Sequence, residues 1–206
     1  MPAAAAPAPA PAPARLLTYL DSLPSQCSSL PSLVVFDLDD TLWWPELYML
    51  DGPPFSKDPQ GVVRDRRGEQ IYLHEGARIV LDALHSHPKL ANVKIAIASR
   101  TEYEAWAHTC LEVLDVDPAA AVSAANVIPD KRLWQIFPSN KRRHFDRIQQ
   151  ALAGMPYEDM IFYDNERGNC TEVSKLGVTC VYTPNGLTVD YFLTGLEQHA
   201  RRKQNT

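Results

Sequence analysis

The feature that most constrains the fold is a short apolar run that ends in a cluster of carboxylates. Residues 33–36 read Leu-Val-Val-Phe, and the acidic residues Asp37, Asp39 and Asp40 follow directly. A continuous run rich in β-branched and aromatic side chains is typical of a strand buried on both faces, as in a parallel sheet. Ligands of open α/β sheets bind at the carboxyl ends of the strands. The run therefore predicts a central strand with a functional site at its end.

The spacing of two of these carboxylates indicates a metal. Asp37 and Asp39 are two residues apart, and side chains of an extended chain repeat every two residues, so both face one pocket. Two like charges placed together repel each other unless a cation lies between them. Oxygen ligands favour Mg²⁺. The pair therefore predicts a magnesium site, although a strand that ends in an ordinary polar loop would give the same spacing.

The composition excludes several other classes of protein. The 206 residues suffice for one domain with a substantial core, and 45% hydrophobic and 22% charged residues are ordinary for a globular protein. A net charge of −5 gives no general attraction to nucleic acid or to anionic membranes. No apolar stretch is long enough to span a bilayer. We therefore expect a monomer that binds neither nucleic acid nor a membrane.

The cysteines indicate a reducing compartment. They are scattered without a Cys-x-x-Cys pair, which argues against a zinc site or a redox motif. A domain of this size needs no disulfide framework, so we expect reduced thiols and a cytoplasmic location. The four residues are Cys27, Cys110, Cys170 and Cys180.

The N-terminal segment differs in composition from the rest of the chain. Residues 2–14 are almost entirely Ala and Pro, which favours an extended, disordered tail or a stiff spacer. The tail is also compatible with an organelle transit peptide, although no arginine precedes Arg15. Leucines at 16, 17, 20 and 23 predict a short amphipathic helix. We assign residues 1–31 to this largely disordered segment.

Strands and helices alternate through the remaining residues 32–206. Strands are predicted at 93–98, 160–163 and 178–182, with a weaker one in 121–128, and helices are predicted from 76, over 102–114, from 141 and over 187–201. This alternation predicts a single three-layer αβα Rossmannoid domain with a mostly parallel sheet. An insertion at about 43–74 follows the first strand and contains a predicted β-hairpin from Gly61 to Leu73, which would form a small cap over the site.

Polar groups follow three of the predicted strands, and a lysine begins a helix. In order they are Asp37 with Asp39, Ser99, Lys141, and Asp164 with Asn165. This order and spacing resembles the four motifs of the haloacid dehalogenase (HAD) superfamily of phosphotransferases, over residues 32–183. The resemblance implies the HAD-like fold and phosphatase chemistry, with a phosphorylated small molecule or a phosphoprotein as the substrate.

A finer resemblance covers four segments. They are Phe-Asp-Leu-Asp-x-Thr-Leu-Trp at 36–43, the Val-Arg-Asp-Arg-Arg-Gly hairpin at 63–68, Ala-Ser-Arg-Thr at 98–101 and Lys-x-x-His-Phe at 141–145. These resemble the eukaryotic magnesium-dependent phosphatases of the superfamily. The resemblance implies a small cap and Mg²⁺, with phosphotyrosine and fructosamine 6-phosphates as associated substrates. The hairpin arginines Arg64, Arg66 and Arg67 are candidates for binding an anionic substrate, or else form a solvated tip.

The resemblance also implies a role for each motif residue. Asp37 is the expected nucleophile, which forms an aspartyl-phosphate, and Asp39 is the expected general acid and base. Mg²⁺ is expected to bind the Asp37 carboxylate and the backbone carbonyl of Asp39. Four further residues are expected to bind the phosphate or the substrate: Leu38 through its backbone N–H, Ser99, Arg100 and Lys141.

One position departs from the family pattern. The fourth motif usually has a carboxylate where this chain has Asn165, so either the neutral amide of Asn165 ligates Mg²⁺ or Asp164 takes the role. The departure also suggests a second hypothesis, a catalytically weak interaction protein on the same fold. A third is a receiver-like phosphoacceptor module. Such modules carry the phosphorylated aspartate on a middle strand, however, and here the second strand ends in Ser99 without a nearby aspartate.

Overall fold

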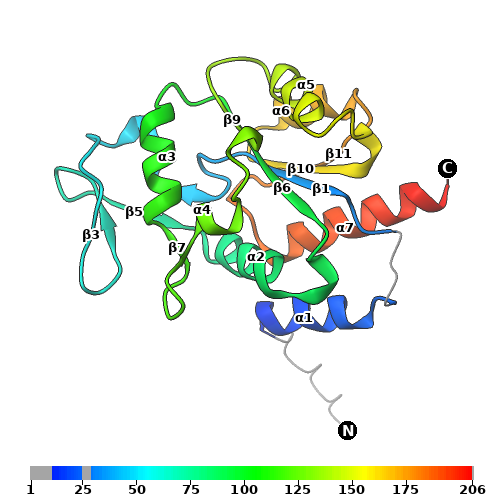
Figure 1. Cartoon of the computed structure of the whole chain (residues 1–206), viewed down its shortest axis with the longest axis horizontal. Helices are drawn as coiled ribbons and strands as arrows, with labels where there is room; N and C mark the ends of the chain where they lie inside the picture. The colour runs from blue at the N-terminus through cyan, green and yellow to red at the C-terminus, as the bar shows by residue number, and fades with distance from the viewer. Residues whose placement is uncertain (1–10, 25–28, 206) are drawn as a thin grey trace, which may run out of the picture.

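A five-stranded parallel sheet forms the centre of the molecule (Figure 1). The computed structural model describes residues 11–24 and 29–205. Five strands form the sheet: β1 (Leu33–Phe36), β6 (Lys94–Ser99), β9 (Trp134–Ile136), β10 (Met160–Asp164) and β11 (Thr179–Tyr182). Their order is β11-β10-β1-β6-β9, and every neighbouring pair is parallel. The predicted central strand is therefore confirmed, because β1 lies in the middle with all four residues buried.

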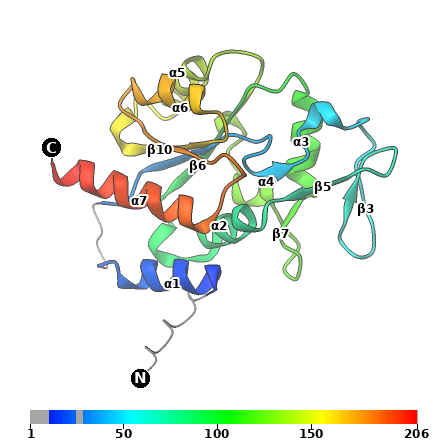
Figure 2. The ribbon, with the colours of Figure 1, turned by 180° about the vertical axis from the view of Figure 1, so that it is seen from behind.

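Helices cover both faces of this sheet and complete three layers. One face carries α5 (Lys141–Ala151) and α6 (Arg167–Ser174), and the other carries α2 (Glu75–Ser86) and α7 (Val189–Gln204), as Figures 1 and 2 show. A hydrophobic core lies on each face of the sheet, because successive side chains of β1 point to opposite faces. Leu33 and Val35 pack with α5 and α6, and Val34 and Phe36 pack with α2 and α7. The predicted αβα architecture is confirmed.

A helix near the N-terminus packs outside this second layer. The helix α1 (Ala12–Ser22) contacts α2 and α7, with Leu16 and Leu20 fully buried. Arg15 pairs with Asp190 at 2.7 Å. This confirms the amphipathic helix, but it differs from the expectation that residues 1–31 are largely disordered, because two leucines here belong to the main core. The Ala/Pro run up to residue 10 and the segment 25–28 with Cys27 lie outside the described residues.

A small antiparallel sheet forms the cap that the sequence predicts. It contains β2 (Trp43–Trp44), β5 (Gln70–Leu73), β4 (Val63–Arg64) and β3 (Ser56–Lys57) in that order, together with the 3-10 helix η1 (Leu47–Met49). The cap lies beyond the carboxyl ends of the parallel strands, at the left of Figure 1. It contacts α3 (Glu104–Val113) through Gly52, where an added Cβ would lie 2.4 Å from the Trp106 ring. The positive φ of 91° at Gly52 also favours glycine.

The weaker strand predicted within residues 121–128 is confirmed only as a two-residue strand, and it does not join the main sheet. Only Val122–Ser123 (β8) is extended, and it pairs with β7 (Asp115–Asp117) outside the main sheet. The next residues form the short helix α4 (Ala124–Val127), because Ser123 and Asn126 make a reciprocal capping box. The fifth strand of the sheet is instead β9, which is only three residues long. Further 3-10 turns lie at Pro88–Leu90, Lys131–Leu133 and Tyr157–Asp159.

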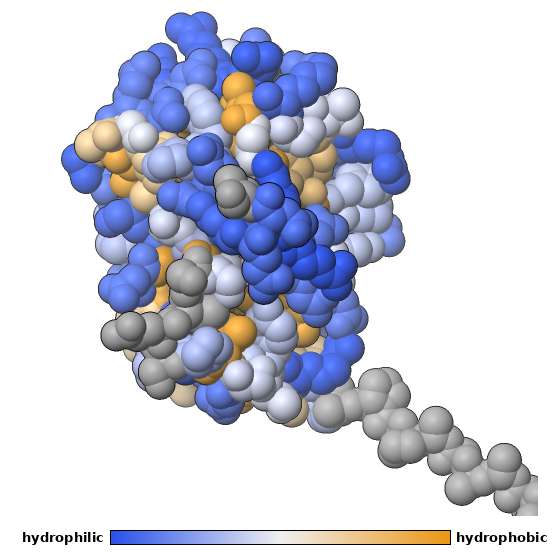
Figure 3. Space-filling view, turned by 90° about the vertical axis from the view of Figure 1, so that its right-hand side faces the viewer, coloured by the Kyte–Doolittle hydropathy of each residue, from blue (hydrophilic) through white to orange (hydrophobic). Residues whose placement is uncertain are grey.

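The face at which α7 ends is largely hydrophilic, with scattered hydrophobic side chains (Figure 3). Within the described ranges, no helix is both long and apolar enough to cross a membrane.

Candidate active site

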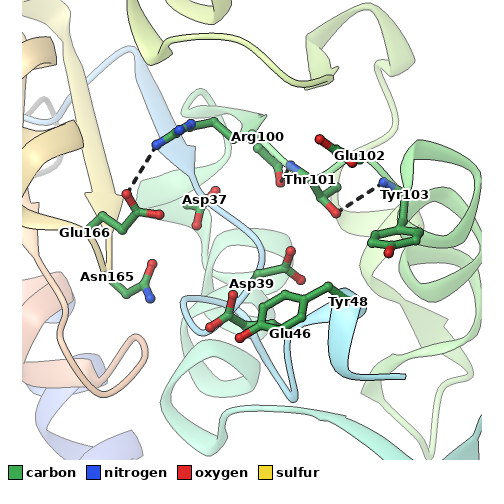
Figure 4. A pocket seen from close by; sticks show the side chains of 11 residues that line it. Asp37, Asp39, Glu46, Tyr48, Arg100, Thr101, Glu102, Tyr103, Asn165 and Glu166 are labelled. Carbon is green, nitrogen blue, oxygen red and sulfur yellow. Dashed lines mark hydrogen bonds and ion pairs between the residues drawn. The ribbon is translucent and has the colours of Figure 1, made fainter. Parts of the chain in front are cut away.

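Loops from three parallel strands and from the cap enclose one pocket (Figure 4). The pocket has a volume of about 430 Å³ and lies at the carboxyl edge of the sheet. Its lining residues follow β1, β6 and β10 or belong to the cap: Asp37, Asp39, Glu46, Tyr48, Ser99, Arg100, Thr101, Glu102, Tyr103, Asn165 and Glu166. The fold therefore brings together the strand-end residues Asp37, Asp39, Ser99 and Asn165 that the sequence predicts.

A tight coil after β1 turns both catalytic candidates toward this pocket. The N–H of Asp37 still donates to the carbonyl of Tyr163 at 3.0 Å, so parallel pairing extends one residue beyond the strand. The chain then curls around Leu38, whose carbonyl accepts the N–H groups of Thr41, Leu42 and Trp43. The side chain of Leu38 is fully buried, so only its backbone is available for binding phosphate.

Lys141 is the buried cation of the site. Its Nζ lies 2.5 Å from Asp37 Oδ1 and 3.0 Å from Asp164 Oδ2, and donates to the carbonyl of Ala98 at 2.5 Å. Burial alone would lower the pKa of Lys141, but attraction to Asp37 and Asp164 outweighs burial and raises the pKa. Asn140 caps α5 at this point by accepting the N–H of Arg143, which fixes where Lys141 enters the core.

Asp164 differs from its neighbour Asn165 in what it faces. Asp164 is fully buried, and its Oδ1 accepts the N–H of Glu166 at 2.6 Å. The Asn169 amide donates to both carboxylate oxygens at 3.1 and 3.0 Å. With Lys141 as a further partner, Asp164 serves to hold the lysine, whereas Asn165 lines the pocket.

The two aspartates of the first motif have raised pKa values. Burial raises the pKa of Asp37 to about 8, partly offset by Lys141. Burial also raises the pKa of Asp39, although hydrogen bonds to its Oδ1 from Trp43 Nε1 at 2.8 Å and from the Leu47 N–H at 3.1 Å lower it. A hydrogen bond with the Thr101 side chain also lowers the pKa of Asp39. A carboxyl with a raised pKa retains its proton toward neutral pH, as a general acid requires.

The lining of the pocket is acidic and fits a divalent cation. Five lining residues are acidic and only Arg100 is basic, while the charge of Lys141 is shared between two carboxylates. Within residues 11–24 and 29–205, no three His, Cys, Asp or Glu side chains form a metal cluster. Mg²⁺ needs no such cluster, because one or two carboxylates suffice when water and phosphate complete its shell. The Asp37 carboxylate and the Asn165 amide oxygen therefore suit Mg²⁺.

The other two predicted phosphate-binding residues, Ser99 and Arg100, lie at the carboxyl end of β6. Ser99 is 1% exposed, and its Oγ accepts the N–H of Thr101 at 3.3 Å. Arg100 is half-exposed and reaches across to Glu166 Oε2 at 3.3 Å, as Figure 4 shows. It also donates to Asn169 Oδ1 at 3.4 Å. Arg100 thus bridges the loops after β6 and β10.

The cap contributes residues that differ from those expected. The hairpin arginines do not line the pocket: Arg64 and Arg67 pair with Asp58 and Asp51 inside the cap. The cap residues that do line it are Glu46 and Tyr48, and the start of α3 adds Glu102 and Tyr103. No motif marks these four positions in the sequence: Tyr48 lies in the 3-10 helix η1, and the other three lie in loops.

His144 is a further residue of the site region. Its two ring nitrogens lie 2.9 Å from the carbonyls of Asn140 and Phe137, so it fixes the loop that leads to Lys141. Burial lowers the pKa of His144, and these two contacts oppose the effect. The Lys-x-x-His spacing was the available signal, since residues three apart share a helix face.

The fold and the site define a HAD-type phosphatase, and comparisons with known proteins agree. A family model described as Acid Phosphatase matches residues 29–202. The chain belongs to this acid phosphatase family. The prediction of a HAD-type phosphatase is thereby confirmed.

Three similar proteins extend the comparison. Human Magnesium-dependent phosphatase 1 is 40% identical over 174 residues, which cover 84% of this chain and 89% of that protein. A HAD-like hydrolase superfamily protein of Schizosaccharomyces pombe is 32% identical over 151 residues, covering 72% and 83%. The crystal structure of the N-terminal part of a Bacteroides fragilis protein contains a phosphatase domain complexed with Mg. It matches with a TM-score of 0.53 at 16% identity, over 82% of this chain and 40% of that chain, and shows likeness of fold alone.

Proposed function

We propose that this protein is a Mg²⁺-dependent phosphomonoester hydrolase that acts through an aspartyl-phosphate on Asp37. The observation that carries the proposal is the contact of 2.5 Å between Asp37 Oδ1 and Lys141 Nζ, with Asp39 in the same pocket. Lys141 holds one oxygen of Asp37, and its charge, together with that of Mg²⁺ when bound, would favour the ionised carboxylate against the effect of burial. The other oxygen is left for attack on phosphorus.

The first half of the reaction transfers the phosphoryl group to Asp37. The Asp37 carboxylate attacks phosphorus, the bond from phosphorus to the ester oxygen breaks, and protonated Asp39 gives its proton to that oxygen. Ser99 and Arg100 bind the other phosphate oxygens. Mg²⁺, when bound, supplies positive charge that offsets the repulsion between the carboxylate and the phosphate dianion.

The second half releases phosphate. Asp39, now ionised, removes a proton from water, which attacks phosphorus and expels the Asp37 carboxylate. The proton that Asp39 lost to the alcohol is thus regained from water, so the site returns to its starting state. The hydrogen bonds from Trp43 and Leu47 hold Asp39 in one orientation for both proton transfers.

We assign the metal to Asp37, the Asp39 backbone carbonyl and Asn165 rather than to Asp164. Asp164 is fully buried and already accepts hydrogen bonds from Glu166, Asn169 and Lys141. Asn165 lines the pocket and offers an uncharged oxygen. A ligand set with one carboxylate predicts modest Mg²⁺ affinity, which Asn165→Asp should increase.

The rim favours substrates whose leaving group is uncharged or cationic. Glu46, Glu102 and Glu166 repel an acidic leaving group, while Tyr48 and Tyr103 offer aromatic surface. Fructosamine 6-phosphates, which carry an amine, fit the carboxylates, and phosphotyrosine fits the aromatic surface. Of these two substrate classes, the excess of carboxylates favours the amine. A comparison of kcat/KM for alkyl phosphates with and without an amine, alongside basic and acidic phosphotyrosine peptides, tests this order.

Hydrolysis of para-nitrophenyl phosphate separates the proposal from its alternatives. The proposal predicts repeated turnover with Mg²⁺ and loss of turnover on chelation. An interaction protein on this fold would give no turnover, and a receiver-like module would take up at most one phosphoryl group per chain. Either result would overturn the proposed function.

A further inference from the structure

The side chain of Asn165 is held by residues of the coil after β1. Its Nδ2 donates to Asp40 Oδ2 at 3.3 Å, and the Thr41 hydroxyl donates to its Oδ1 at 3.5 Å. The backbone N–H of Asn165 donates to the same hydroxyl at 3.0 Å. An ionised carboxylate only accepts hydrogen bonds, so Asp40 requires the amide nitrogen on its own side. In Figure 4 the amide oxygen of Asn165 accordingly points toward Asp37.

Asp40 has a second neighbour on its other side. Its backbone adopts a φ of 50°, in the left-handed region, and Asp40 is not among the residues that line the pocket. Oδ1 lies 3.6 Å from His74 Nε2, while Oδ2 accepts from Asn165. The His74 ring in turn lies against Gly186, where an added Cβ would come within 2.5 Å of it. Each oxygen of Asp40 therefore has its own neighbour, and Oδ2 is the one that accepts a hydrogen bond from Asn165.

We propose that Asp40 is a positioning residue that selects the amide orientation of Asn165 and so presents a neutral oxygen to the cation in the pocket. This rests on the proposed function, because the cation is the one that the hydrolysis requires. An amide turned the other way would point an N–H group at the cation and could not ligate it. A carboxylate at position 165 would instead face Asp40 with like charge, so residues 40 and 165 form a matched pair of acid and amide.

Asp40→Asn keeps a side chain of the same size but no longer selects one amide orientation of Asn165, because an amide at position 40 can pair with either orientation. Loss of the partner that orients a metal ligand typically weakens metal affinity about 10-fold or more. We expect the Mg²⁺ dissociation constant of the metal-free full chain to rise about 10-fold in D40N, measured by calorimetric titration with MgCl₂. The same substitution in an Asn165→Ala chain should cause much less change, because no amide remains to be oriented.

Glu46→Gln is the matched control. Glu46 lines the pocket beside Asn165 and, like Asp40, is an acidic residue. Unlike Asp40, it makes no hydrogen bond to the Asn165 side chain. If Asp40 acts only through its charge, E46Q weakens Mg²⁺ binding as much as D40N, and D40N weakens it equally with and without Asn165. Either result overturns the proposal.

A second measurement keeps the inference separate from the proposed function, because it needs no metal. In the metal-free chain, Asn165→Asp places two carboxylates together and should lower the melting temperature. Adding Asp40→Asn to N165D restores one acid and one amide and should recover most of the loss. Additive effects of the two substitutions would overturn the proposal. Failure of the wild type to hydrolyse phosphomonoesters, with this coupling intact, would instead overturn only the proposed function.

Discussion

The carboxylates at the sheet edge and those on the rim of the pocket are held in very different ways. Asp37 and Asp164 are buried around one lysine, with backbone and side-chain partners at 2.5–3.1 Å. Glu46 and Glu166 sit in loops at the rim, and the Glu166 side chain is 59% exposed. Burial makes each lost partner costly at the sheet edge, whereas solvent screens the rim. We therefore propose that the sheet edge carries the chemistry and that the cap and loops determine the choice of substrate.

The largest effect should come from the nucleophile at the buried edge. Asp37→Asn replaces the carboxylate with a poor nucleophile and should lower kcat by about 10⁵-fold or more, as for other removed nucleophiles. Steady-state hydrolysis measures this, and an unchanged circular dichroism spectrum serves as the control for folding. Turnover of this variant within tenfold of wild type would show that Asp37 is not the nucleophile.

Asp39 should have the next largest effect. Asp39→Asn should slow hydrolysis by about 10²–10⁴-fold, the usual contribution of a general acid and base. The loss should shrink for aryl phosphates, whose leaving groups need less protonation than those of alkyl phosphates. Equal losses for both classes would contradict the assigned acid.

The pKa of Asp39 gives that prediction a pH dependence. Burial raises this pKa, so the protonated acid persists below the raised value and is lost as pH rises through it. The rate for alkyl phosphates should therefore fall on the alkaline side in wild type. That limb should be absent from the profile of D39N.

The third prediction compares the two regions through stability. Lys141→Ala leaves two buried carboxylates unpaired and should cost about 3–5 kcal/mol of unfolding free energy. Lys131→Ala breaks an exposed pair with Glu112 and should cost at most about 1 kcal/mol. Urea unfolding of both variants measures the contrast. Equal costs would show that burial does not distinguish the regions.

The smallest effects should come from the cap. Glu46→Gln should raise KM several-fold for an amine-bearing phosphate and change kcat little, because Glu46 lines only the rim. Replacing Arg64, Arg66 and Arg67 together should change KM less than twofold, since none of them lines the pocket. A larger change in KM from replacing the arginines than from E46Q would show that the hairpin arginines, and not Glu46, contact the substrate.

The parts of the site that could be predicted are those fixed by strand ends. Asp37, Ser99 and Asn165 follow buried strands of one parallel sheet, so their meeting at one edge follows from topology. Strand β9 could not be predicted because Gln135 interrupts two apolar residues, a pattern too short to show a period. The α1 helix was predictable from its leucines, but its burial depends on contacts with α7, nearly the whole chain away.

The orientation of side chains was beyond the sequence. Asp40 and Asn165 are 125 residues apart, and nothing in either loop indicates that their side chains form a hydrogen bond. The proposed preference for Asn165 over Asp164 as the metal ligand also needed the structure, because the sequence does not show that Lys141 pairs with Asp164. The sequence left open whether the hairpin arginines bind substrate or form a solvated tip, because charge at a turn does not show the direction in which the turn points.

The central claim is that Asp37 carries the phosphoryl group during turnover. Acid quenching of the full chain during steady-state hydrolysis with Mg²⁺, followed by borohydride reduction and peptide mass spectrometry, tests it directly. Reduction of an aspartyl-phosphate yields homoserine, and we predict homoserine at position 37 in wild type and none in Asp37→Asn. Rapid hydrolysis with no reduced residue at position 37, or with one at another acidic residue, would contradict the account.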